Sequence, residues 1–130
     1  MYMNTTHIIT NEAIEYLNRE LVLPSTGREQ DWEIELADSN RINEFISFYE
    51  NKPLSDDKKF ALMALIIGSL ENLAYIKSIN KDIWGKVARL LCARIELYKP
   101  LIDYWSLVGE DNNDDDTFAI TKLMRSLKCC

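Results

Sequence analysis

Glycine, proline and histidine are scarce in this chain. Its 130 residues include 4 Gly, 3 Pro and 1 His. Because glycine and proline end helices and form tight turns, their scarcity favours a few long helices over many short strands. A chain of this length is typical of one domain and can bury an independent core. We therefore expect a single domain over residues 1–130, with 1–9 and 128–130 loosely ordered.

The single histidine limits the chemistry that the chain can assemble. Paired-histidine metal sites need a second histidine, and a nucleophile–histidine pair would need His7 to fold back onto a distant residue. The glycines occur singly, so no phosphate-binding loop is present. The acidic run does not match an EF-hand calcium-binding loop that would begin at Asp111. The sixth position of that loop is Asp116 instead of Gly, and the twelfth is Lys122 instead of Glu. We expect no enzymatic activity, no cofactor and no metal.

Long apolar runs and a cysteine framework are also lacking. The most apolar stretch, residues 60–70, is about half as long as a membrane span. No signal peptide is expected at the start of the chain, so the predicted location is the cytoplasm. Cys92 lies among apolar residues and is expected to be a small core residue. Cys129 and Cys130 are expected to be reduced, and their role stays open.

Apolar residues recur at helical spacing along most of the chain. The clearest helix start is Ser55, whose side chain can cap the first turn of a segment that is apolar nearly all round from Phe60 to Ile67. Thr10 or Asn11, and later Asn80, can cap two other helices. These patterns predict an all-α fold, a compact bundle of about five to seven helices around a central apolar helix at residues 55–77.

Three local features carry more detailed expectations. Residues 28–38 alternate like a short strand, but a lone strand has no partner, which favours an irregular or helical lead-in to a helix that stops before Pro53. Pro100 is expected to kink or end the helix that begins near Asn80, and Gly109 is placed to cap the segment that follows. Glu71 is expected to point inward and pair with an arginine such as Arg89 or Arg94.

Acidic residues dominate the charge, and the net charge is −6. One run of carboxylates lies at residues 29–38 around Trp32, and five of the seven residues at 110–116 are acidic. An aromatic residue within such a cluster can anchor a protein partner, whereas the alternative is that Trp32 packs in the core and the acids are solvated. The candidate partner-binding residues are Asp31, Trp32, Glu33, Glu35, Asp38, Asp111, Asp114, Asp115 and Asp116.

Three stretches of sequence carry a family resemblance. They are Asp31-Trp32-Glu33 to Asp38, then Arg41-Ile-Asn-Glu-Phe, then Leu54-Ser-Asp-Asp-Lys-Lys-Phe-Ala-Leu-Met-Ala-Leu-Ile. This pattern, over about residues 31–72, resembles small bacterial immunity proteins encoded beside polymorphic toxins, including those of contact-dependent growth inhibition.

The resemblance implies a protein that binds a toxin domain in the cytoplasm and covers its active site or substrate groove. Many such toxins are nucleases with basic grooves, which an acidic inhibitor would complement. The resemblance assigns no functional role to any individual residue of this chain. The alternative is a non-catalytic adaptor or regulatory module that binds another protein.

Overall fold

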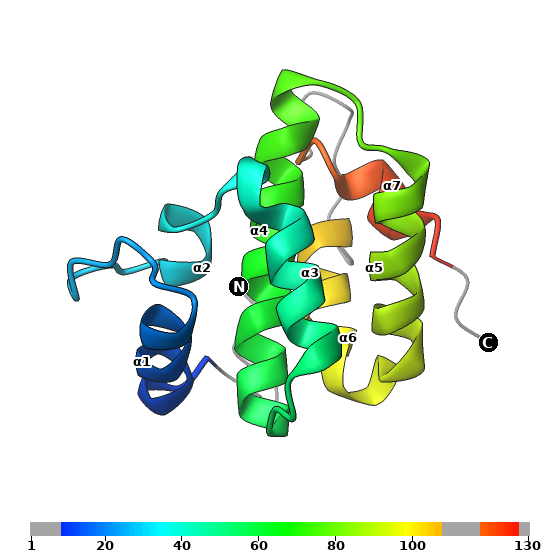
Figure 1. The fold of residues 1–130 in the computed structure, drawn as a ribbon. Coiled ribbons are helices and arrows are strands. Elements are labelled where there is room, and N and C mark those ends of the chain that lie inside the picture. Colours follow the sequence, from blue (N-terminus) through cyan, green and yellow to red (C-terminus); the bar gives the residue numbers. More distant parts are fainter. Residues whose placement is uncertain (1–8, 108–117, 128–130) are drawn as a thin grey trace.

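The structure is a computed structural model that describes residues 9–107 and 118–127. Within these residues it contains helices and no strand, which confirms the predicted all-α bundle (Figure 1). The elements are α1 (Asn11–Glu20), α2 (Trp32–Glu35), the 3₁₀ helix η1 (Ser39–Arg41), α3 (Ile42–Asn51), α4 (Asp56–Ile76), α5 (Lys81–Ala93), α6 (Ile95–Ser106) and α7 (Thr121–Arg125).

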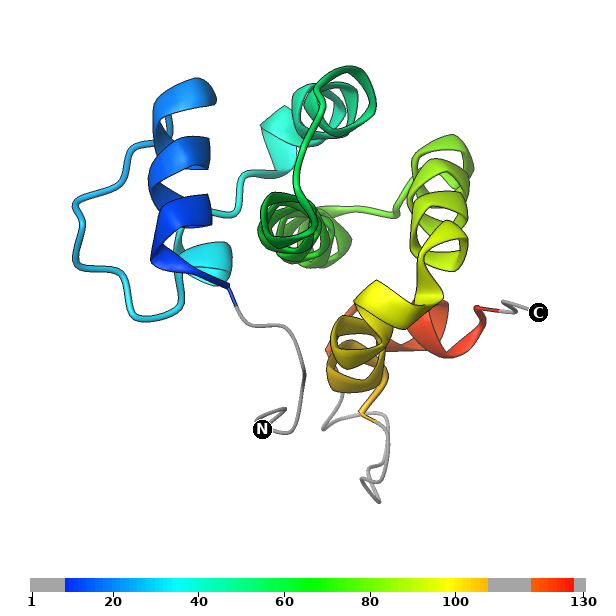
Figure 2. The same cartoon turned by 90° about the horizontal axis from the view of Figure 1, so that it is seen from below.

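Helix α4 is the centre of the bundle, as predicted. Ser55 caps it by accepting a hydrogen bond from the backbone N–H of Lys58, and every side chain from Phe60 to Leu70 is buried. Helices α1, α2, α3 and α6 pack around it (Figures 1 and 2). By length and composition α4 could cross a membrane, but 72% of its apolar window is buried inside the fold. Its all-round apolarity is therefore accounted for by packing against other helices.

Other predicted helix boundaries are also confirmed. Thr10 accepts a hydrogen bond from the backbone N–H of Ala13, and Asn80 accepts one from Asp82. Residues 28–38 contain the short helix α2 and no strand, and α3 ends two residues before Pro53. Local capping chemistry thus defines these helix starts.

The break between α5 and α6 lies at Arg94 instead of Pro100, so the predicted position was wrong. Arg94 leaves helical geometry with φ −132° and ψ 53°, while Pro100 continues inside α6. The Arg94 guanidinium pairs with Asp56 at 3.1 Å and with Glu96 at 2.7 Å, which ties this corner to the start of α4. Helix α6 ends at Ser106, and the next residue, Leu107, adopts a left-handed conformation with φ 57°. Gly109 lies outside the described residues.

Glu71 points into the protein, as expected, but its partners are not arginines. Its carboxylate oxygens accept hydrogen bonds from the backbone N–H groups of Ala119 at 2.9 Å and Ile120 at 2.8 Å. A buried carboxylate of α4 therefore satisfies donors just before α7 that would otherwise be orphaned. The expected pairing with Arg89 or Arg94 was wrong. The partners of Glu71 are the backbone groups of Ala119 and Ile120, which lie almost fifty positions later in the chain, and no helical spacing relates them to Glu71.

Cys92 also differs from expectation. It is half-buried on α5 and is disulfide-bonded, so it is not simply a small core residue. Cys129 and Cys130 lie outside the described residues.

Candidate protein-binding surface

Residues 29–38, named here the acidic segment, lie directly on the central helix. The backbone carbonyl of Glu33 approaches Gly68 so closely that an added Cβ there would stand 2.5 Å from the oxygen. The backbone N–H of Asp38 donates to Ser69 Oγ at 2.9 Å, and Asn72 Nδ2 donates to the carbonyl of Ala37 at 3.5 Å. Small residues on α4 thus let this segment pack close to the central helix.

Two carboxylates of the acidic segment organise its own backbone. Glu29 accepts hydrogen bonds from Ser25 Oγ and from the backbone N–H of Thr26, each at 2.7 Å. These bonds lower the pKa of Glu29 from 4.5 to about 2, and the bond from Ser25 has the largest effect. Glu35 accepts hydrogen bonds from the backbone N–H groups of Gln30 and Asp31, both at 2.9 Å. The loop therefore holds its negative charges in defined positions.

Trp32 belongs to the core. Its side chain is only 3% exposed, and its indole Nε1 donates to Asn18 Oδ1 of α1 at 2.9 Å. A buried ring cannot present its face to another protein in this conformation. Trp32 is therefore a core residue within a charged segment, which is the alternative that the sequence left open, and it does not anchor a partner in this conformation.

Asp31 and Glu33 bring negative charge toward α6. Burial raises the pKa of Tyr104 on α6, and the charges of Glu33 and then Asp31 raise it further. Helices α2 and α6 lie on different sides of α4 (Figure 2). The carboxylates of Glu33 and Asp31 at the start of α2 therefore act electrostatically on a residue outside the acidic segment. Asp38, in contrast, caps η1 by accepting from the backbone N–H of Asn40.

The other predicted cluster is the acidic run of residues 110–116. Asp111, Asp114, Asp115 and Asp116 lie outside the described residues, so their part in binding stays a prediction.

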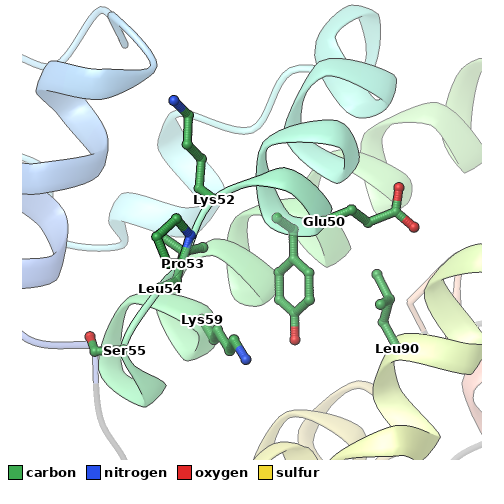
Figure 3. Close-up of a pocket in the computed structure, with 8 residues that line it drawn as sticks. Glu50, Lys52, Pro53, Leu54, Ser55, Lys59 and Leu90 are labelled. Carbon is green, nitrogen blue, oxygen red and sulfur yellow. The ribbon is translucent and has the colours of Figure 1, made fainter.

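A hollow of about 610 Å³ lies at the corner between α3 and α4 (Figure 3). Its lining carries both signs of charge, from Glu50, Lys52 and Lys59, beside apolar groups such as Leu90. Figure 3 shows the two lysines extending in different directions, so they do not converge on one point. Beneath it the buried hydroxyls of Tyr49 and Tyr98 bond to each other, and desolvation raises the pKa of both phenols. Because the charges that line the hollow differ in sign and do not converge, they favour neither an anionic nor a cationic ligand.

Sequence reasoning missed two exposed apolar side chains at the end of α4. Tyr75 is 74% exposed and Ile76 is 71% exposed, although the helix before them is buried. Their only sequence signal is that the apolar pattern continues past the end of the buried stretch. Large exposed apolar side chains are common in protein interfaces, but two adjacent residues do not make a large patch.

A metal site gains no support from the part of the chain that the structure describes. Among residues 9–107 and 118–127, no group of three or more His, Cys, Asp or Glu side chains could hold a metal ion. Comparison with protein-family models, with curated proteins and with solved structures finds no match for this chain.

Proposed function

We propose that this protein is a non-catalytic immunity protein, which binds a basic toxin domain in the cytoplasm and covers its active site or substrate groove. The toxin is proposed to be a nuclease, whose phosphate-binding groove carries the positive charge that an acidic partner complements. The sequence resemblance over residues 31–72 suggests this class.

The observation that carries the proposal is the way the acidic segment is held. Its backbone is fastened to α4 at Gly68 and Ser69, and its own carboxylates brace the loop. A braced anionic segment loses little conformational freedom when it binds a cationic surface, which lowers the cost of association. Its charge also accelerates encounter with a basic partner.

A specific experiment tests this proposal. The tagged protein is co-purified from its own cells, the bound protein is identified, and its association rate is measured at several salt concentrations. The double variant Asp31→Asn/Glu33→Gln should associate about tenfold more slowly, and the loss should shrink as salt screens the charges. The matched control Glu12→Gln/Glu15→Gln removes the same number of negative charges from the exposed face of α1 and should bind like the parent.

Protection of cells provides the second readout. Cells that express the identified partner should survive with the parent protein and with the α1 control. If the partner has no toxic activity, the immunity proposal fails and the alternative, an adaptor or regulatory module, replaces it. If the Asp31/Glu33 variant binds and protects like the parent, this part of the acidic segment is not the binding surface.

A further inference from the structure

Positive charge is concentrated where α4 ends and α5 begins. Residues 72–93 contain four basic side chains and one acidic side chain, although the net charge of the chain is −6. The basic residues are Lys77, Lys81, Lys86 and Arg89, and all four are exposed. Within residues 9–107 and 118–127, no ion pair involves any of these four side chains. Their charge is therefore available to a partner.

The same place exposes two apolar side chains in a defined conformation. Tyr75 and Ile76, which are 74% and 71% exposed, end helix α4. The helical hydrogen bonding continues past them, because the backbone N–H of Lys77 donates back to α4 at 2.9 Å. Ile79 then packs against the core and holds the turn into α5. We name residues 75–81 the basic tip, and Figure 1 shows this link at one end of the bundle.

The chemistry of the basic tip fits an anionic lipid surface. Two adjacent apolar side chains are too few for the apolar patch of a typical protein interface. A peripheral membrane contact combines apolar side chains that enter the headgroup region with basic side chains that are attracted to anionic lipids. Tyrosine suits that boundary, because its ring is apolar and its hydroxyl is polar. Lysine reaches the phosphates along its apolar stem.

The acidic groups of the chain lie away from the basic tip. Helix α4 has 21 residues, so Asp56 at its start is about 30 Å from the tip. The acidic segment is attached at Ser69, about 10 Å along the helix from Ile76. Salt screens charges over about 8 Å at physiological ionic strength. A surface that touches the tip therefore meets mainly the positive charge of the tip itself.

We propose that the basic tip docks this protein reversibly on anionic phospholipid membranes. Tyr75 and Ile76 enter the headgroup region, and Lys77 and Lys81 contact the lipid phosphates. Each lysine at such a surface strengthens binding about fivefold. The contact is weak and reversible, because two side chains bury little apolar area. It does not use the acidic segment and is independent of the proposed toxin binding.

Flotation of the full chain with lipid vesicles tests the charge requirement. The parent should bind vesicles that contain phosphatidylglycerol, should not bind pure phosphatidylcholine, and should bind less as salt rises. Lys77→Gln/Lys81→Gln should lower the partition coefficient about 25-fold. The matched control Arg28→Gln/Lys52→Gln removes two exposed positive charges outside the tip and should lower it less than about twofold.

A second pair of measurements tests insertion. Tyr75→Ser/Ile76→Ser should lower the partition coefficient about tenfold and leave its dependence on salt unchanged, because it removes apolar surface and no charge. In the parent, NMR signals of residues 75–81 should broaden on vesicles that contain a paramagnetic lipid, more than signals of α1. This comparison needs no variant, so a misfolded variant would not prevent the test.

Four results would overturn the inference. They are no binding of the parent to phosphatidylglycerol vesicles, equal losses in the tip and control double variants, full binding by Tyr75→Ser/Ile76→Ser, and equal broadening of the tip and α1. If the parent ignored vesicles but bound polyglutamate through the tip, an acidic polypeptide would replace the membrane as its partner. Toxin association is measured without lipid, so its failure and the failure of membrane docking are distinguishable.

Discussion

Gly68 lies against the backbone carbonyl of Glu33, and an added Cβ at position 68 would stand 2.5 Å from that oxygen. The contact joins the centre of α4 to the middle of α2. Because real Cβ atoms do not approach a carbonyl oxygen so closely, position 68 determines how near the acidic segment comes to the core.

Gly68→Ala should therefore destabilise the protein. Displacement of α2 costs about 1–3 kcal/mol, partly offset by the better helix propensity of alanine, so the free energy of unfolding should fall by about 1–2 kcal/mol. Urea unfolding measures it. The control is Gly85→Ala on α5, where the nearest atom, Arg89 Nη1, would be 3.7 Å away. That change should stabilise by about 0.5–1 kcal/mol, and equal effects of the two variants would contradict the steric argument.

Glu71→Gln should loosen the segment before α7. A glutamine side chain offers one acceptor and one donor group, so one of the backbone N–H groups of Ala119 and Ile120 loses its partner. The expected loss is about 1–3 kcal/mol. Backbone hydrogen exchange at residues 119 and 120 should accelerate more than exchange in α1. The exposed control Glu15→Gln should change stability by less than about 0.5 kcal/mol, and unchanged exchange at both amides would refute the role assigned to Glu71.

The buried hydroxyls of Tyr49 and Tyr98 should behave as a coupled pair. Tyr49→Phe or Tyr98→Phe leaves one buried hydroxyl without its partner and should cost about 1–2 kcal/mol. The double variant should cost less than the sum of the two, because it leaves no orphaned hydroxyl. A double-mutant cycle from chemical denaturation measures the coupling. Strictly additive losses would show that the hydroxyls do not depend on each other.

Neutralising the start of α2 should change the ionisation of Tyr104. In Asp31→Asn/Glu33→Gln the tyrosinate no longer faces two negative charges, so the pKa of Tyr104 should fall toward 10. It should stay above its ordinary value, because burial is the larger cause. Titration by NMR measures the shift, and Glu12→Gln/Glu15→Gln should leave it unchanged. An unaltered pKa in the α2 variant would mean that these carboxylates do not act on Tyr104.

The acidic segment should loosen only in strong acid. The pKa of Glu29 is lowered from 4.5 to about 2, so the folded state binds the Glu29 proton more weakly than the unfolded chain. Its contribution to stability is therefore complete above pH 4.5 and is lost as the pH falls toward 2. An NMR titration of the Glu29 carboxyl should give a midpoint near pH 2. A midpoint near pH 4.5 would show that the hydrogen bonds from Ser25 and Thr26 do not form in solution.

Local chemistry explains which features the sequence could predict. A capping oxygen acts on the first turn of its own helix, so Thr10, Ser55 and Asn80 reveal helix starts without knowledge of the fold. The apolar run of α4 indicates burial on all sides. The charge of residues 29–38 is also visible in the sequence, but whether those carboxylates meet a partner is not.

Long-range contacts explain the failures. Pro100 has a strong local tendency to break a helix, yet the break lies at Arg94, which is bonded to Asp56 in another helix. Glu71 binds backbone groups almost fifty residues later, and no spacing rule relates them. The sequence left two positions open for Trp32, a surface anchor or a core residue, and a hydrogen bond to Asn18 on another helix secures its ring in the core.

The sequence by itself determined that the protein is an all-α bundle built around residues 55–77, because capping and helical periodicity act over a few neighbouring residues. The tertiary structure alone decided where α5 ends, what Glu71 binds, that Trp32 is buried, and how closely the acidic segment packs on α4. Each of these depends on groups that are distant in the chain and become neighbours only when several helices exclude water together.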